Sequence, residues 1–367
     1  MIFYLTDSLV VLETDPSFND IRKAVRNLAT ASCEGKHYVL GDLDALEYFR
    51  EVFKPANDDV SKLFDTLSQN YPTQIIPSDV IVYFEIVNSD TYVKKQNDDQ
   101  EIIQVPYKDF IDSSSAQATV LIGEDVEYDC WFYKYIKNWY LKVKGLNVSC
   151  KYFDRHGGGG RMKTVIESCY TQKETSLCFV DTDERFPGQP VNNNSTYRKC
   201  MSARKGVRNG VYPLTVHEIE NLLPMNYIDQ LQYEGEHRDR KIVFDVLKNS
   251  NQSEMVLQFF DFKDGLKKYV EYKDTDSFIN FAKTVCEINP IVMGGMTFDE
   301  YYSSKGDNEL LYPGLMGRIL KHTIDLIKNN ATLQAPVLLS FQDAEWRRIG
   351  RLMLSYGFAR NVEGISN

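Results

Sequence analysis

The sequence lacks any apolar run near the roughly 20 residues that a membrane-spanning helix needs. The first segment, MIFYLTDSLVVLETD, contains no basic residue and its apolar run is interrupted at Asp7, so we expect a strand there and no signal peptide. The seven cysteines are odd in number, spread along the chain, and never form C-x-x-C. This argues against a disulfide framework and a zinc knuckle. We therefore expect a cytoplasmic protein that does not act at a membrane.

Positive charge is also in short supply. The chain has 42 Lys and Arg against 52 Asp and Glu, a formal net charge of −10. This balance argues against a protein that coats nucleic acid through bulk positive charge. The five histidines form no pair with the spacing of metal ligands, so we assign no zinc site. His156 and His217 are expected to be incidental.

The chain is long and rich in aromatic side chains. Its 367 residues are enough for about two or three domains, and Phe, Trp and Tyr make up 13%, which can fill large cores. A polar stretch at 94–101 (KKQNDDQE) and a small-residue stretch at 112–117 (DSSSAQ) mark a boundary. We predict an N-terminal α/β region of unknown role over 1–115, a central domain over 116–265, and a mainly helical region over 266–367.

Strands and helices alternate in the middle region. Residues 118–122, 146–153 and 176–180 have the composition of strands, whereas 125–142 and 161–171 have helical apolar spacing. This order predicts an α/β fold with a Rossmann-like, mostly parallel central sheet and right-handed crossovers. In open sheets of this kind, ligands bind at the carboxyl ends of the strands.

Acidic residues follow two of these predicted strands. Glu124 comes after the first strand (LIGED), and Asp181 and Asp183 come after the third (FVDTDER). Alternation along an extended chain sends Asp181 and Asp183 to the same side. Grouped carboxylates suit Mg²⁺ or Mn²⁺, and such ions can activate a water and stabilise the leaving oxygen in phosphodiester cleavage. The sequence therefore predicts a metal site made of Glu124, Asp181 and Asp183.

Taken in order, these motifs resemble a TOPRIM domain, the metal-binding fold of topoisomerases, primases and overcoming-lysogenization-defect nucleases. The resemblance is closer to stand-alone bacterial TOPRIM proteins that act as nuclease effectors in anti-phage defence. It covers about residues 118–265 and rests on Glu124, Asp129, Phe132-Tyr133, the glycine turn 157–160, the D-x-D pair, Ile219-Glu220-Asn221 and Lys263-Asp264-Gly265.

The resemblance implies an activity and roles for single residues. Glu124, Asp181, Asp183 and Glu220 would hold Mg²⁺ or Mn²⁺, Glu124 would also move protons, and Lys263 would neutralise a phosphate. The activity implied is a metal-dependent endonuclease that cleaves DNA or RNA, with tRNA among the candidates. The implied setting is a toxic effector of an antiviral defence system, released by an ATPase sensor and able to form a homodimer.

The sequence departs from the TOPRIM pattern at the first strand. TOPRIM domains usually read Glu-Gly there, whereas this chain has Gly123 before Glu124. Asp125 or Glu127 could therefore share the role of Glu124, and Glu218 competes with Glu220. Each acid also has a structural interpretation as a turn or helix cap.

A basic segment, 197–210 (YRKCMSARKGVRNG), follows the predicted metal ligands and contains no acid. Five cations of this kind can hold a nucleic-acid backbone locally; a solvated basic face is the alternative. The predicted nucleic-acid contacts are Arg198, Lys199, Arg204, Lys205 and Arg208.

Two other functions remain open at the level of the sequence. A strand followed by D-x-D also resembles the haloacid-dehalogenase pattern, in which Asp181 would be the nucleophile of a phosphatase or phosphotransferase. That family usually carries Thr or Val where this chain has Arg185, and its D-x-D usually lies nearer the start of the domain. The third possibility is a non-catalytic, metal-binding regulatory protein.

Overall fold

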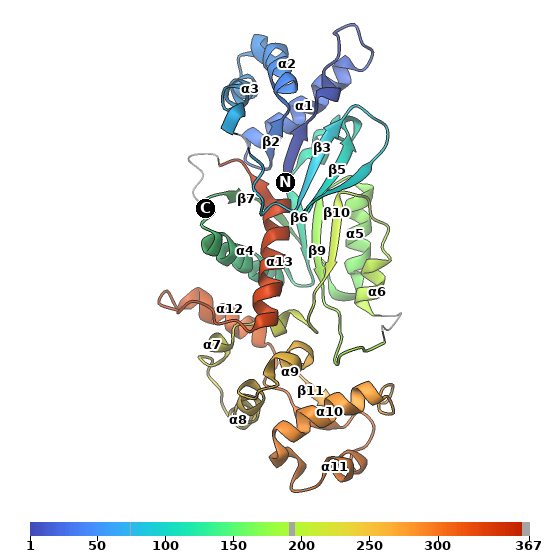
Figure 1. Cartoon of the computed structure of the whole chain (residues 1–367), viewed down its shortest axis with the longest axis vertical. Coiled ribbons are helices and arrows are strands. Elements are labelled where there is room, and N and C mark those ends of the chain that lie inside the picture. Colours follow the sequence, from blue (N-terminus) through green and yellow to red (C-terminus); the bar gives the residue numbers. More distant parts are fainter. Residues whose placement is uncertain (74, 191–194, 362–367) are drawn as a thin grey trace. The chain divides into compact units, whose positions relative to one another are not determined.

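The computed structural model describes residues 1–73, 75–190 and 195–361 (Figure 1). The chain forms two compact units, each of which is described by itself. Unit 1 comprises Met1–Cys178, Ser202–Tyr212 and the chain from Arg347 on, and unit 2 comprises Phe179–Met201 and Pro213–Trp346. These units cut across the three predicted regions, because the end of the chain returns to pack with its beginning.

Unit 1 contains a first sheet, built from the N-terminal third of the chain. Its strand order is β2-β1-β3-β5-β4, with β1, β2, β3 and β5 parallel and β4 antiparallel to β5. The strands are β1 (Ile2–Leu5), β2 (Tyr38–Gly41), β3 (Val82–Val87), β4 (Val93–Asn97) and β5 (Gln100–Pro106). Three amphipathic helices accompany them: α1 (Phe18–Cys33), α2 (Leu43–Phe53) and α3 (Asp59–Gln69).

The second sheet of unit 1 confirms the predicted α/β fold with a mostly parallel central sheet. Its strand order is β10-β9-β6-β8, and β6 runs parallel to both β8 and β9. The strands are β6 (Thr119–Gly123), β8 (Tyr152–His156), β9 (Ser176–Val180) and β10 (Asn209–Pro213). Helix α4 (Trp131–Lys144) connects β6 toward β8, and α5 (Met162–Thr171) connects β8 to β9. β9 (SLCFV) is buried along its whole length.

The core of unit 1 joins segments that are far apart in the sequence. Leu354 of α13 (Ser340–Gly357) and Phe358 pack with Ile2 of β1 and with Tyr140 and Leu141 of α4. The short strand β13 (Phe358–Ala359) pairs antiparallel with β7 (Ser149–Cys150). The last turns of α13 therefore stabilise both the first strand and the helix that follows β6.

Unit 2 is mainly helical and has an aromatic core. Phe244, Phe260, Phe262 and Tyr312 are buried, and their ring centroids lie 5.2 to 6.5 Å apart. Besides the start of α13, its elements are α6 (Thr196–Met201), α7 (Met225–Ile228), α8 (Glu236–Lys248), α9 (Ser253–Phe259), β11 (Gly265–Lys267), α10 (Asp276–Ile288), α11 (Phe298–Ser304), β12 (Leu310–Pro313) and α12 (Ile319–Asn329).

Two local predictions differ from the structure. The polar stretch 94–101, interpreted as part of a connection, is the β4–β5 hairpin; β4 is exposed on every residue, so an edge strand has the composition of a loop there. The region 266–367, predicted to be mainly helical, also contains strand β12, which pairs antiparallel with β11. Among the described residues, no helix has both the length and the apolar character needed to cross a bilayer.

Candidate functional site

The segment after β9 lies against residues 214–219 of unit 2. The Leu214 amide donates to the Val180 carbonyl at 2.9 Å, and the Asp183 amide donates to the His217 carbonyl at 3.1 Å. The Ile219 amide donates to Asp181 Oδ1 at 3.0 Å. These backbone bonds bring the D-x-D pair beside the His-Glu-Ile-Glu sequence, although more than thirty residues separate them in the chain.

Asp181 and Asp183 were predicted to point to the same side because of strand alternation, but both lie beyond the end of the strand. β9 ends at Val180, and Asp183 has a left-handed backbone with φ of 56°. Asp tolerates this conformation better than most residues because its short side chain can bond locally. Strand alternation therefore does not decide where Asp183 points; a turn fixed by its bond to the His217 carbonyl does.

The Ile-Glu-Asn block is a 3-10 turn (Ile219–Leu222) held by Asn221. Asn221 is fully buried; its Oδ1 accepts from the Glu218 amide, and its Nδ2 donates to the carbonyls of Leu257 and Phe260 at 2.7 and 2.8 Å. Gln342 of α13 donates to the Asn221 carbonyl at 2.8 Å. Asn221 is thus a positioning residue, and it joins the block to the segment that carries Asp261.

The third segment is the tight turn 261–265. Asp261 Oδ1 accepts from the amides of Lys263 and Asp264, both at 2.8 Å. Gly265 has φ of 78°, and a Cβ there would lie 2.2 Å from the Tyr312 carbonyl oxygen, so only glycine fits. This explains the glycine in the Lys-Asp-Gly motif and fixes the backbone of Lys263.

Lys263 brings two carboxylates together. Its Nζ lies 2.7 Å from Glu218 Oε2 and 3.3 Å from Glu220 Oε1. Burial alone would lower the pKa of Lys263, but the charges of Glu220 and Glu218 outweigh it and raise that pKa. Lys263 therefore stays charged near neutral pH and serves as a fixed positive charge rather than a proton donor.

The acids around Lys263 are costly to keep ionised. Burial raises the pKa of Glu220; Lys263 opposes this shift and Glu218 adds to it. Burial also raises the pKa of Asp183, with His217 acting against the shift and Glu218 adding to it. Glu220 Oε2 is buried and accepts no hydrogen bond from any residue that the structure describes. A bound cation would satisfy this oxygen and favour the ionised carboxylates.

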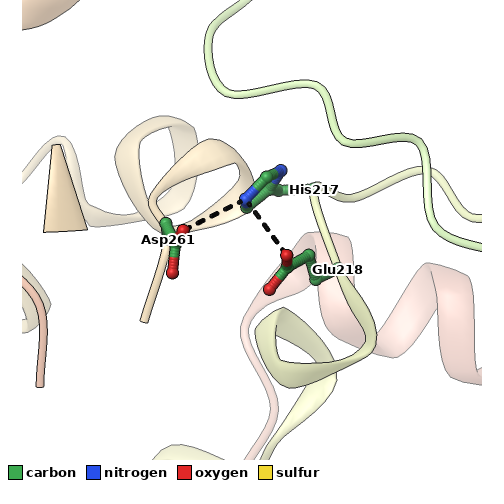
Figure 2. Close-up of side chains that lie close together, drawn as sticks. All are labelled: His217, Glu218 and Asp261. Atoms are coloured by element: carbon green, nitrogen blue, oxygen red, sulfur yellow. Dashed lines mark ion pairs between the residues drawn. The ribbon is translucent and has the colours of Figure 1, made fainter. Parts of the chain in front are cut away.

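From the sequence, no functional role was assigned to His217 or to Asp261. His217 is fully buried, and Figure 2 shows its ring between Glu218 and Asp261, with Nε2 3.7 Å from Glu218 Oε1 and 3.8 Å from Asp261 Oδ2. One ligand atom from each of the three residues lies within 4.8 Å of the others, so the group has the dimensions of a metal site. Asp261 lies far from His217 in the chain, so no sequence spacing indicated that these two residues are close. The only local indication of the site was that His217 and Glu218 are adjacent in the sequence.

Glu124 belongs to unit 1, where β6 leads into it. The Gly157 amide donates to the Gly123 carbonyl at 2.7 Å, and the Gly158 amide donates to the Glu124 carbonyl at 3.3 Å. The glycine turn 157–160 therefore fixes the backbone at the end of β6. Asp181 and Asp183 belong to unit 2, so coordination of one ion by all three acids stays a prediction.

Asp125 and Glu127, the alternative metal ligands at the end of β6, differ in their surroundings. Asp125 Oδ1 accepts from the amides of Glu127 and Tyr128 at 2.7 and 3.2 Å, so Asp125 caps the turn that follows β6. Glu127 is exposed. A Cβ at Gly123 would lie 2.9 Å from Cys130 Sγ, so the packing at the end of β6 favours glycine at this position.

The basic segment is divided between the units. Arg198 and Lys199 lie on α6 in unit 2, whereas Arg204 and Lys205 lie in unit 1. Arg204 is exposed and its guanidinium lies 5.0 Å from the Tyr170 ring centroid.

Arg208, the fifth predicted contact, is only 4% exposed. It donates to the Ser115 carbonyl at 2.8 Å, lies 3.5 Å from Asp109 Oδ2 and packs on Phe110. Its charge stabilises the interior of unit 1, so the expected surface group is reduced to four cations.

Comparison with known proteins adds no family to this description: no known protein family, no curated protein and no solved structure matches the chain.

Proposed function

We propose that this protein is a metal-dependent nuclease of the TOPRIM type, which hydrolyses phosphodiester bonds of DNA or RNA, including tRNA. The observation that carries the proposal is the group of carboxylates that unit 2 gathers around one lysine. Asp183, Glu218 and Glu220 interact electrostatically with Lys263, which lies far along the chain from the D-x-D pair. Arg185 also acts on Asp183. The three acids outnumber these two cations, which is the charge balance expected of a site for a divalent ion.

Asp181, Asp183 and Glu220 are the residues of unit 2 that would hold Mg²⁺ or Mn²⁺, with Glu124 as the ligand predicted from unit 1. The buried Glu220 Oε2, which lacks a hydrogen-bond donor among the described residues, fits this role. When bound, the ion would activate water and stabilise the leaving oxygen. All of these ligands are oxygens, as Mg²⁺ prefers.

The side chains of the protein supply the remaining parts of the reaction. Lys263 keeps its charge, so it would stabilise negative charge on the phosphate without giving up a proton. The Asp181 carboxylate is oriented by the Ile219 amide, and the Asp183 backbone by the His217 carbonyl. Glu124 is the residue proposed to move protons. Arg198, Lys199, Arg204 and Lys205 would contact the backbone of the substrate.

The biological role follows from the resemblance alone and is part of the same proposal. The cleavage would be the toxic step of an anti-phage defence system in the cytoplasm. An ATPase sensor would release the nuclease, and a homodimer is its proposed assembly.

The test uses the full chain with supercoiled plasmid and with total RNA, each in Mg²⁺, in Mn²⁺ and in chelator. We expect cleavage of one substrate that stops in chelator. Asp183→Asn and Glu220→Gln should each slow it by roughly 100-fold or more, as when a group acting on the reacting phosphate is lost.

Glu287→Gln is the matched control, because this exposed acid of α10 pairs only weakly with Lys283 at 3.8 Å. It should cleave at the rate of the wild type. Equal rates in Glu220→Gln and wild type, or no cleavage under any condition, would remove the proposal.

A further inference from the structure

We propose that His217, Glu218 and Asp261 form a separate binding site for a divalent transition-metal ion such as Zn²⁺ or Mn²⁺. The site is proposed from unit 2 alone and does not depend on nuclease activity. It differs from the carboxylate site above because it includes an imidazole nitrogen.

The first reason is the state of His217. Its side chain is fully buried, and neither Nδ1 nor Nε2 has a hydrogen-bond partner among the residues that the structure describes. Buried polar atoms are rarely left in this state, because the hydrogen bonds to water that are lost on folding are not replaced. Nε2 faces two carboxylate oxygens at 3.7 and 3.8 Å (Figure 2), which is too far for a direct hydrogen bond.

The second reason is that these separations suit a shared ion. Ligand atoms about 2.1 Å from one ion at tetrahedral or octahedral angles lie about 3.0 to 3.4 Å from each other. The three ligand atoms already lie within 4.8 Å of one another. Binding would require the carboxylate side chains to rotate so that the widest of these separations shortens by about 1.5 Å.

The third reason is that other contacts leave the facing oxygens available. Asp261 receives both of its backbone hydrogen bonds at Oδ1, and Oδ2 faces His217. Glu218 meets Lys263 through Oε2, and Oε1 faces His217. The His217 backbone is fixed by the Gln258 carbonyl and the Asp183 amide. The three ligands are therefore held in place by groups that do not compete for the ion.

The ligand set determines which ion is preferred. One imidazole nitrogen with two carboxylate oxygens suits Zn²⁺ and Mn²⁺, whereas Mg²⁺ prefers oxygen ligands and retains its waters. An ion bound here would tie the segment that follows β9 to the turn that carries Lys263. It would thus hold Lys263 in position.

The experiment measures binding to the metal-stripped full chain without nucleic acid, so a failure of cleavage would leave its result unchanged. Calorimetry with Zn²⁺ compares wild type with His217→Gln and Asp261→Asn. Asn at position 261 can still accept the two backbone bonds, so this variant should keep the fold. We expect both variants to bind Zn²⁺ at least about tenfold more weakly. His322→Gln, a change at an exposed histidine of α12, should match wild type.

Mn²⁺ provides a second, histidine-specific measurement. Pulsed electron paramagnetic resonance should detect a coupled ¹⁴N nucleus in wild type and in His322→Gln, and this coupling should disappear in His217→Gln. Equal Zn²⁺ affinity in His217→Gln and wild type, or a nitrogen coupling that survives the substitution, would overturn the proposal.

Discussion

The ammonium group of Lys263 determines how the acids of unit 2 are held. It contacts Glu218 and Glu220 from a turn that Gly265 makes possible. If Lys263 were removed, two neighbouring carboxylates would lose their shared counter-charge, and at least one would take up a proton more readily. The same lysine therefore opposes the rise that burial causes in the pKa of Glu220, and it would present a positive charge to a phosphate.

Arg208 and Arg204 allow a prediction about two cations of the same basic segment. Arg208→Ala would remove the guanidinium that lies beside the buried Asp109 and leave the contacts of this acid with Tyr92 and Lys173. We therefore expect a loss of about 3 kcal/mol in the free energy of unfolding. Arg204→Ala, at an exposed position, should change it by less than about 0.5 kcal/mol. Urea unfolding at neutral pH measures both.

For nucleic-acid affinity, we expect Arg204→Ala to have the larger effect of the two variants. Among molecules that remain folded, Arg204→Ala should weaken binding to single-stranded RNA or DNA at low salt, whereas Arg208→Ala should not. An Arg208→Ala protein of unchanged stability would contradict the structural role given to this residue.

The pairing of β11 with β12 holds the turn that carries Lys263, and two glycines permit the close approach of these strands. A Cβ at Gly314 would lie 2.5 Å from the Lys263 carbonyl oxygen. We therefore expect Gly314→Ala to destabilise the protein by about 1 to 3 kcal/mol and to displace Lys263. Gly317→Ala is the matched control, because no atom lies within 4 Å of a Cβ there. Thermal unfolding measures both; equal melting temperatures would count against this packing.

Elements were predictable where the apolar pattern is strong. Strand β9 has the bounds that the sequence indicated. The β4–β5 hairpin was missed because an edge strand exposed on every residue carries no apolar alternation. The first segment was expected to form a strand; β1 ends at Leu5 and a 3-10 turn follows.

The candidate site was only partly predictable for a related reason. The D-x-D pair and Lys263 are visible as motifs, but the contact of His217 with Asp261 depends on tertiary packing. Asn221 makes this contact possible through its bonds to the Leu257 and Phe260 carbonyls. The burial of Arg208 likewise depends on Asp109 and Ser115, which precede it by about ninety residues.

The net charge of −10 is not evenly distributed over the molecule. Part of the acidic excess is concentrated in unit 2, where the proposed ions would offset it. Contact with nucleic acid would then depend on bound metal and on a few exposed cations, so it should weaken both in chelator and in high salt.

The proposal is tested most directly by X-ray diffraction from crystals of the full chain grown with Mn²⁺, recorded at the manganese absorption edge. We predict an anomalous peak about 2.1 Å from carboxylate oxygens of Asp181, Asp183 and Glu220, the distance typical of small divalent ions with oxygen ligands. Manganese that binds elsewhere while these three acids stay without an ion would contradict the proposed nuclease site.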